Sequence, residues 1–397
     1  MSVTTASLTS SPVQRESQTH FWLRDRNWDL IFITLSVILV PLPYLFYLLG
    51  LKLGIEDDVS RNIVNGFVAV AVGGPHMMST MLRTGLDNEF KSRYPMLIRS
   101  SVIIPIVVIS LAFLNLTLLL TIFFFWASIH VLHQVTYIVE LYNHKEHKII
   151  RSGSAVSLRS RLIDYAVILT CLFPIATYKI SHDNFFIGKN DLGRVIPEFF
   201  KQPWFFIAAS TVFGVALAAF VVKTVREYRG GYINWPKTAF ISLTALVSFT
   251  VPALPNMDTA FQGMNTWHSF QYLAITFYII KIRQQYGNLD QSAPLVARFS
   301  KGKDSRGLFA LSTMMLVGSA VVFVIVRVIA EFVTPPMINP ATYSSIADFQ
   351  NALTNWRFDV AYYTAILSFL WIHYYHDHFL FTNFEALDLG YSGKPEA

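Results

Sequence analysis

The feature that most constrains this chain is a series of apolar stretches, each about as long as a lipid bilayer is thick. A hydrocarbon core of about 30 Å needs roughly 20 apolar residues in a helix. The stretches that reach this length lie near residues 28–50, 63–83, 101–117, 119–140, 162–180, 203–223, 238–254, 261–281, 307–330 and 358–382. Only 14% of the 397 residues are charged, against about 25% in a soluble domain. The sequence therefore predicts an all-α, polytopic integral membrane bundle of about ten transmembrane helices.

Two of these segments come from one uncharged run between Ser101 and Val139, which is too long for a single span. We expect it to fold at Leu114-Asn115-Leu116 into a helical hairpin. The start of the chain is polar and rich in Ser and Thr, without the basic region and short apolar core of a removable signal peptide. The predicted organisation is a polar cytoplasmic tail at 1–27, a transmembrane helical domain at 28–382 and a cytoplasmic tail at 383–397.

The net charge of +6 comes from basic residues that lie between the apolar stretches. They concentrate before the first segment and after the second, fourth, sixth and eighth, as the positive-inside rule requires of cytoplasmic loops. We therefore expect a multi-pass protein of the bacterial inner membrane with both termini in the cytoplasm. Because the basic residues form no single stripe, the expected partners are membrane lipids and a hydrophobic small molecule, and not nucleic acid. Oligomeric state is not predicted.

Seven of the eleven histidines fall inside predicted spans, where ionisable side chains are costly and usually mark a functional site. All seven lie on the second, fourth, eighth and tenth segments, which run in the same direction in this topology. The chain has one cysteine, Cys171, so neither an intrachain disulfide nor a thiolate metal cluster can form. Histidine sets without thiolates are typical of non-haem iron sites.

Residues three or four positions apart share one face of a helix, which groups these histidines with other polar side chains. The candidate metal ligands are His76, His130, His133, His268, His373 and His376. The candidates that would support and orient these ligands are Gln134, Glu140, Gln271 and Asp377. Tyr137 and Tyr272 are candidate catalytic residues that would orient reaction intermediates. Pro75 should also kink the second helix, because it lacks a backbone N–H.

The order of Gly74-Pro75-His76, Ser128-Ile129-His130, Trp267-His268-Ser269 and a final helix with histidines resembles the Brp/Blh family of membrane β-carotene dioxygenases. The resemblance implies a non-haem iron that cleaves a carotenoid with dioxygen, held by His76, His130, His268 and one of His373 or His376. Family members usually have a histidine where this chain has Tyr272, and a Pro where it has Ile372. Short segments such as Gln284-Gln285-Tyr286-Gly287 also resemble uncharacterised polytopic bacterial membrane proteins.

The leading hypothesis is a metal-dependent membrane oxidoreductase, a dioxygenase-like enzyme in which histidines hold Fe²⁺ and a hydrophobic substrate, a carotenoid or a lipid, enters between helices. A second is a membrane electron-transfer protein in which histidine pairs bind b-type haem. A third is a transporter that moves protons or metal ions along the histidines, Glu140, Asp377 and Arg327. A fourth is a structural or assembly protein whose histidines only connect helices.

Overall fold

The computed structural model of this chain describes residues 21–150, 157–187, 190–255, 257–335, 338 and 340–382. These residues are almost entirely helical, and their strands are one two-residue pair, in which β1 (Phe186–Ile187) runs antiparallel to β2 (Asn190–Asp191). The predicted all-α class is therefore confirmed. The predicted tail at 383–397 and all of the tail at 1–27 except residues 21–27 lie outside the described residues.

The helices follow one another along the chain with few long connections. The first half contains α2 (Arg26–Asp29), η2 (Leu30–Thr34), η3 (Leu35–Leu39), α3 (Leu42–Lys52), α4 (Asp57–Val68), η4 (Ala69–Gly73), α5 (Gly74–Arg83), α6 (Asn88–Arg93), α7 (Pro95–Ser100), α8 (Ile103–Leu114), α9 (Leu116–Ile150), α10 (Leu158–Thr170), α11 (Phe173–Ser181), η5 (Leu192–Val195) and α12 (Glu198–Lys201). The second half contains α13 (Pro203–Arg229), α14 (Trp235–Thr250), η6 (Val251–Ala253), α15 (Met257–Gln285), α16 (Leu289–Ser292), α17 (Pro294–Ser300), α18 (Arg306–Met314), α19 (Val317–Glu331), η7 (Pro340–Thr342) and α20 (Ile346–Leu380).

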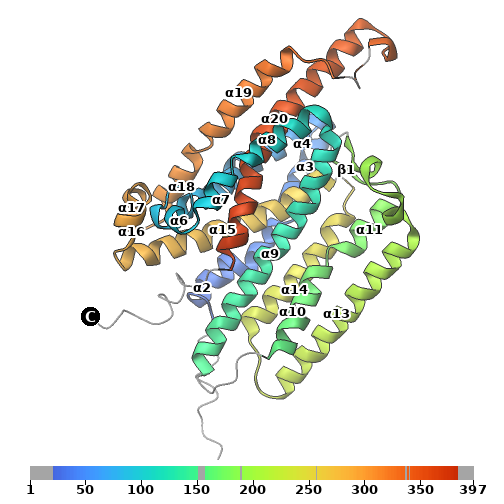
Figure 1. Cartoon of the computed structure of the whole chain (residues 1–397). Coiled ribbons are helices and arrows are strands. Elements are labelled where there is room, and N and C mark those ends of the chain that lie inside the picture. Colours follow the sequence, from blue (N-terminus) through green and yellow to red (C-terminus); the bar gives the residue numbers. More distant parts are fainter. Residues whose placement is uncertain are drawn as a thin grey trace, which may run out of the picture.

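The long helices form one bundle, with α13 and α19 at opposite edges in the view of Figure 1. Helix α20 packs along α19 and α8 on one side, and α13 packs along α10 and α11 on the other. Helices α9 and α15 lie between these groups and contact one another, and α15 also packs on α5. The middle of the bundle is therefore built from segments that are far apart in the sequence.

In the described part of the chain, six helices are long and apolar enough to cross a membrane. They cover Arg26–Lys52, Pro95–Leu114, Leu116–Glu146, Leu158–Ser181, Pro203–Arg229 and Arg306–Glu331, and each overlaps one of the predicted spans. Helices α13 and α19 turn large apolar side chains outward, including Val215 (66% exposed) and Val324 (59% exposed). An apolar surface of this kind is suited to contact with lipid, which favours a membrane protein.

The other four predicted spans are helical, but they are not among these six helices. They correspond to η4 with α5, to α14, to α15 and to α20, and each contains buried polar residues, such as Thr244 in α14 and Gln271 in α15. Polar side chains lower the hydropathy of a helix, and they are tolerated where it faces other helices instead of lipid. That these four segments also cross the membrane stays a prediction.

The long uncharged run breaks where the sequence predicts it. Helix α8 ends at Leu114 and α9 begins at Leu116, with Asn115 in an extended conformation between them. The Asn115 side-chain oxygen accepts a hydrogen bond from the Leu118 backbone N–H at 3.0 Å. Asn115 therefore caps the start of α9, which is the usual way in which Asn begins a helix.

Helix α15 comes unusually close to the backbone of η3 and the turn after it. A Cβ atom placed on Gly263 would lie 1.9 Å from the Val40 carbonyl oxygen and 2.9 Å from its carbonyl carbon. Only a residue without a side chain permits this approach. Gly263 therefore fixes the depth at which α15 sits in the bundle.

We expect Gly263→Ala to destabilise the protein, because the added methyl group must displace backbone atoms. Overpacking of this kind costs about 1–3 kcal/mol. Thermal unfolding of the protein in detergent measures the change. Gly66→Ala is the matched control, because nothing lies within 4 Å of the added Cβ in α4. Equal melting temperatures for the two variants would contradict the close contact between α15 and Val40.

Candidate metal centre

Four helices each contribute one buried histidine to a single cluster. His76 of α5, His130 of α9, His268 of α15 and His373 of α20 each offer a ligand atom, and these atoms lie within 4.8 Å of one another. Each ring contacts two others in a closed cycle. The centroid separations are 4.7 Å for His76 and His268, 5.0 Å for His268 and His130, 4.8 Å for His130 and His373, and 4.3 Å for His373 and His76.

The structure thus brings together one histidine from each of the four segments that the sequence singles out. At most 4% of any of these four residues is exposed to solvent. Neighbouring rings meet nearly at right angles, with interplanar angles of 67–83°. This edge-to-face arrangement differs from parallel stacking of aromatic rings, and it brings one ligand atom of each imidazole within 4.8 Å of the others.

Five of the eight ring nitrogens of the cluster lack hydrogen-bond partners among the described residues. His76 Nδ1, His130 Nε2, His373 Nε2 and both ring nitrogens of His268 are buried without a partner among the described residues. A buried polar atom left in this state costs about 1–3 kcal/mol. A bound metal ion would remove the cost, because imidazole nitrogens are good ligands for iron, zinc and copper. The cluster could therefore bind a metal ion, whose identity the ligands alone do not fix.

The helix backbone is irregular in the turn just before His76. Helices α4, η4 and α5 follow one another without a break, so Pro75 lies inside a continuous helical run, and its missing N–H removes one backbone hydrogen bond there. The preceding turn, η4, is a π-helical turn that the Gly74 N–H closes onto the Ala69 carbonyl. The predicted irregularity at Pro75 therefore takes the form of a π turn, a feature often found at functional sites.

Asp377 joins the cluster to a buried network of hydroxyl groups. Its Oδ1 accepts hydrogen bonds from the Tyr272 hydroxyl at 2.6 Å and from the Thr80 hydroxyl at 3.0 Å. Its Oδ2 lies 3.4 Å from His373 Nδ1 and 3.8 Å from His130 Nε2. The structure therefore places Asp377 beside two of the clustered histidines, where the sequence predicts a supporting carboxylate.

Tyr272 is in contact with the cluster, and Tyr137 packs against Phe381. The Tyr272 ring lies 4.6 Å from the His76 ring, and its hydroxyl also lies 2.7 Å from Thr80 Oγ1. Tyr137 is buried and stacks on Phe381, at a centroid separation of 4.9 Å and an interplanar angle of 24°. Tyr272 is therefore the predicted catalytic residue whose ring lies against a clustered histidine.

The structure places two predicted ligands outside the cluster. The two ring nitrogens of His376 lie within hydrogen-bond distance of hydroxyls, Nε2 at 2.7 Å from Ser101 and Nδ1 at 3.0 Å from Thr84. His133 is only half-buried, and its ring faces His378 and Phe381. His130 and His133 are three residues apart on α9, so a small rotation of this helix about its own axis determines which of the two faces the cluster.

Three predicted supporting residues make other contacts. Gln134 Nε2 donates to the His268 carbonyl oxygen at 3.0 Å, so it reaches the backbone of a clustered residue and not its ring. Gln271 Nε2 donates to the Ile33 carbonyl at 2.8 Å. Glu140 forms an ion pair with Arg161 of α10 at 2.7 Å. Gln271 and Glu140 therefore connect helices at other points of the bundle.

Sequence reasoning missed Thr80 and two aromatic residues of the site. Thr80 lies one helical turn after His76, so the i, i+4 rule could have found it. Its hydroxyl is hydrogen-bonded to His373 Nδ1. Tyr374 stacks on His130 at 4.1 Å, and Phe381 lies at 5.8 Å from the same ring. No spacing signal distinguishes these two from the many other aromatic residues of the chain.

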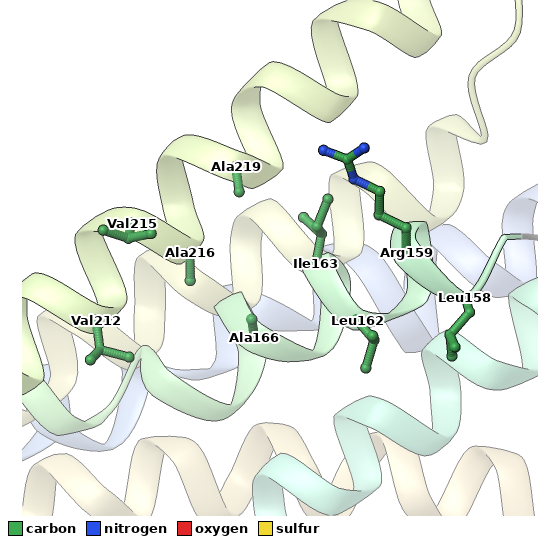
Figure 2. A pocket seen from close by; sticks show the side chains of 9 residues that line it. All are labelled: Leu158, Arg159, Leu162, Ile163, Ala166, Val212, Val215, Ala216 and Ala219. Atoms are coloured by element: carbon green, nitrogen blue, oxygen red, sulfur yellow. The ribbon is translucent and has the colours of Figure 1, made fainter.

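An open apolar groove lies elsewhere, between α10 and α13. Figure 2 shows Leu162 and Ala166 of α10 across from Val212 and Ala216 of α13, with Arg159 as the one charged residue of its lining. All of the lining residues come from these two helices, whereas the four histidines come from α5, α9, α15 and α20. This groove is therefore separate from the histidine cluster.

Comparison of the chain with known protein families, with characterised proteins and with solved structures found no match.

We expect Tyr272→Phe to lower stability even in protein treated with a chelator, because Asp377 and Thr80 lose a buried hydrogen-bond partner. A loss of this kind costs about 1–3 kcal/mol. Thermal unfolding in detergent is the measurement, and Tyr178→Phe is the control, because Tyr178 is 44% exposed. If the two variants unfold at the same temperature, the hydroxyl network around Asp377 is not a stabilising contact.

Proposed function

We propose that this chain is an integral membrane oxidoreductase in which His76, His130, His268 and His373 hold one non-haem iron ion. The observation that carries the proposal is the set of four buried imidazoles from four helices, with ligand atoms within 4.8 Å of one another and five of their eight ring nitrogens without a partner among the described residues. Isolated histidines that only connect helices would each have a hydrogen-bond partner, as His376 has with Ser101 and Thr84.

The preference for iron rests on the donor set and on the resemblance. Imidazole also suits zinc, copper and nickel, so the four histidines by themselves leave the metal open. The resemblance to the Brp/Blh dioxygenases favours Fe²⁺, and with it a carotenoid or another hydrophobic molecule as the substrate. Bound iron would supply the activation of dioxygen for oxidation of that substrate.

The chain's own residues would orient the ligands and keep water out. With its proton on Nδ1, His373 donates to Thr80, and Thr80 in turn donates to Asp377, which leaves the His373 Nε2 lone pair for a metal. Hydrogen bonds of this kind fix the orientation of a ligating imidazole. Tyr374 and Phe381 cover the His130 ring and supply an apolar wall on that side.

The proposed location is a bacterial inner membrane, with several spans and with both termini in the cytoplasm. The apolar outer faces of α13 and α19 support a membrane location, and the alternation of basic residues along the sequence supports this orientation. A hydrophobic substrate dissolved in the bilayer would then reach the bundle from its side.

The geometry favours a bare metal ion over b-type haem. Bis-histidine haem needs two imidazoles on opposite faces of a wide, flat macrocycle. In this cluster each of the four rings contacts two others at centroid separations of 4.3–5.0 Å. A macrocycle between any two of the histidines would occupy the positions of the other two.

The transport hypothesis receives less support from the charged residues. Glu140 is paired with Arg161, and Arg327 is paired with Glu331 on its own helix. Asp377 alone among the charged residues of that hypothesis lies beside the histidines. These groups therefore do not form one continuous polar pathway through the described part of the bundle.

The first test is metal analysis with a visible spectrum on protein purified in detergent and reconstituted anaerobically with Fe²⁺. We expect about one iron per chain and no Soret band, because the four imidazoles form one site. His130→Ala and His373→Ala should each lose most of the iron and remain folded. Glu140→Gln is the matched control, since it removes a charge from α9 without touching the cluster, and it should retain the iron.

A Soret band would favour haem in place of bare iron. Failure of the unmodified protein to bind iron, or equal iron content in the His130→Ala variant, would contradict the proposed centre.

The second test asks whether the centre is catalytic or only structural. Structural metal sites have a complete set of protein ligands, whereas catalytic sites keep a position for a further ligand. We expect nitric oxide, a dioxygen surrogate, to bind the Fe²⁺-loaded protein and give the electron paramagnetic resonance signal of a high-spin iron nitrosyl. No signal from protein of full iron content would favour a structural metal that ties α5, α9, α15 and α20 together.

A further inference from the structure

A second pair of histidines lies next to the four-histidine cluster but closer to the surface. His133 of α9 and His378 of α20 have ring centroids 5.4 Å apart. Neighbouring rings within the cluster are 4.3–5.0 Å apart, so this pair has nearly the same spacing. His133 is half-buried and His378 is exposed, in contrast to the fully enclosed cluster.

The ring nitrogens of this pair are available for a ligand. Among the described residues, neither imidazole has a hydrogen-bond or ion-pair partner, whereas the neighbouring His376 contacts hydroxyls through its two ring nitrogens. The pair therefore combines access from the surface with two uncommitted ligands, which His376 does not.

The Phe381 side chain contacts both the pair and the cluster. The Phe381 ring lies 5.1 Å from the His133 ring and 5.8 Å from the His130 ring. His130 and His133 are also separated by less than one turn of the same helix. An ion held by His133 and His378 would therefore be next to Phe381, which also contacts His130, a ligand of the proposed centre.

We infer that His133 and His378 form a metal-acquisition site, which captures a divalent transition-metal ion at the surface and passes it to the four-histidine cluster. The inference rests on the proposed function, because it needs the cluster to be the final metal site. Two imidazoles bind an ion less tightly than four, so transfer inward is favourable. A captured ion is also present at a high effective concentration beside the cluster.

The experiment follows the loading of metal-free protein in detergent with Co²⁺, whose visible absorption changes when imidazoles bind it. Three proteins are compared with the unmodified chain: His378→Ala, the double variant His133→Ala/His378→Ala, and His182→Ala as the control. His182 is an exposed histidine next to Tyr178, so its loss removes one surface imidazole far from the pair. The single variant changes only an exposed side chain and keeps the test valid if the double variant does not fold.

We expect loading of the double variant to be slower by about tenfold or more, since the local supply of the ion is lost. His378→Ala should be slower than the unmodified protein, and His182→Ala should load at the unmodified rate. The final Co²⁺ content should be the same in all four proteins. This combination of a slower rate and an unchanged content is the signature of an acquisition site.

Each other outcome overturns the inference in a distinguishable way. Unchanged loading rates would remove the acquisition role and leave the four-histidine centre intact. Loss of the final Co²⁺ content in His378→Ala would mean that the outer pair belongs to the centre itself. If the unmodified protein binds no Co²⁺ and no Fe²⁺, the proposed function fails, and the acquisition site fails with it.

Discussion

The constraint on which this structure depends is the burial of four imidazoles without hydrogen-bond partners for their inward nitrogens. Some buried polar groups of the bundle are paired with one another, and others, such as the hydroxyls of Thr244 and Ser248, have no partner among the described residues. Among the paired groups, Glu146 accepts from Asn234 at 2.9 Å and pairs with Lys237 at 3.3 Å. In the cluster, five unpartnered ring nitrogens instead belong to four imidazoles whose ligand atoms lie within 4.8 Å of one another. Because unmatched polar atoms are costly inside a protein, their convergence points to a ligand that the sequence is organised to hold.

Position in the bundle, and not the cluster alone, accounts for the unequal hydropathy of the helices, because α9 carries His130 and is still one of the six distinctly apolar helices. Helices α5, α15 and α20 hold three of the four histidines and run through the interior, so their polar residues need no contact with lipid. Helices α13 and α19 lie at the edges and are apolar. The hydropathy of a segment therefore reports its place in the bundle as well as its ability to span a membrane, which explains why only six of the ten predicted spans are distinctly apolar.

The helical class, the break at Asn115 and the four helices that share the site were all readable from the sequence, because they depend on composition and on local spacing. The sequence does not indicate that His130 belongs to the cluster and His133 does not, or that His373 belongs to it and His376 does not. Both pairs are three residues apart, and the inward position is set by the rotation of α9 and α20 against their neighbours. The ion pair between Glu140 and Arg161 was not readable either, because helix periodicity within α9 gives no information about a partner on α10.

The surroundings of the four histidines are not equivalent, and this difference bears on what the centre does. On one side, Thr80, Tyr272 and Asp377 form a hydroxyl and carboxylate network against His373. On the other, Tyr374 and Phe381 place aromatic rings against His130. A purely structural metal needs only four ligands. The oxidation proposed for this centre would draw on both surroundings, because hydroxyl and carboxylate groups can hold protons beside His373 and aromatic rings exclude water beside His130.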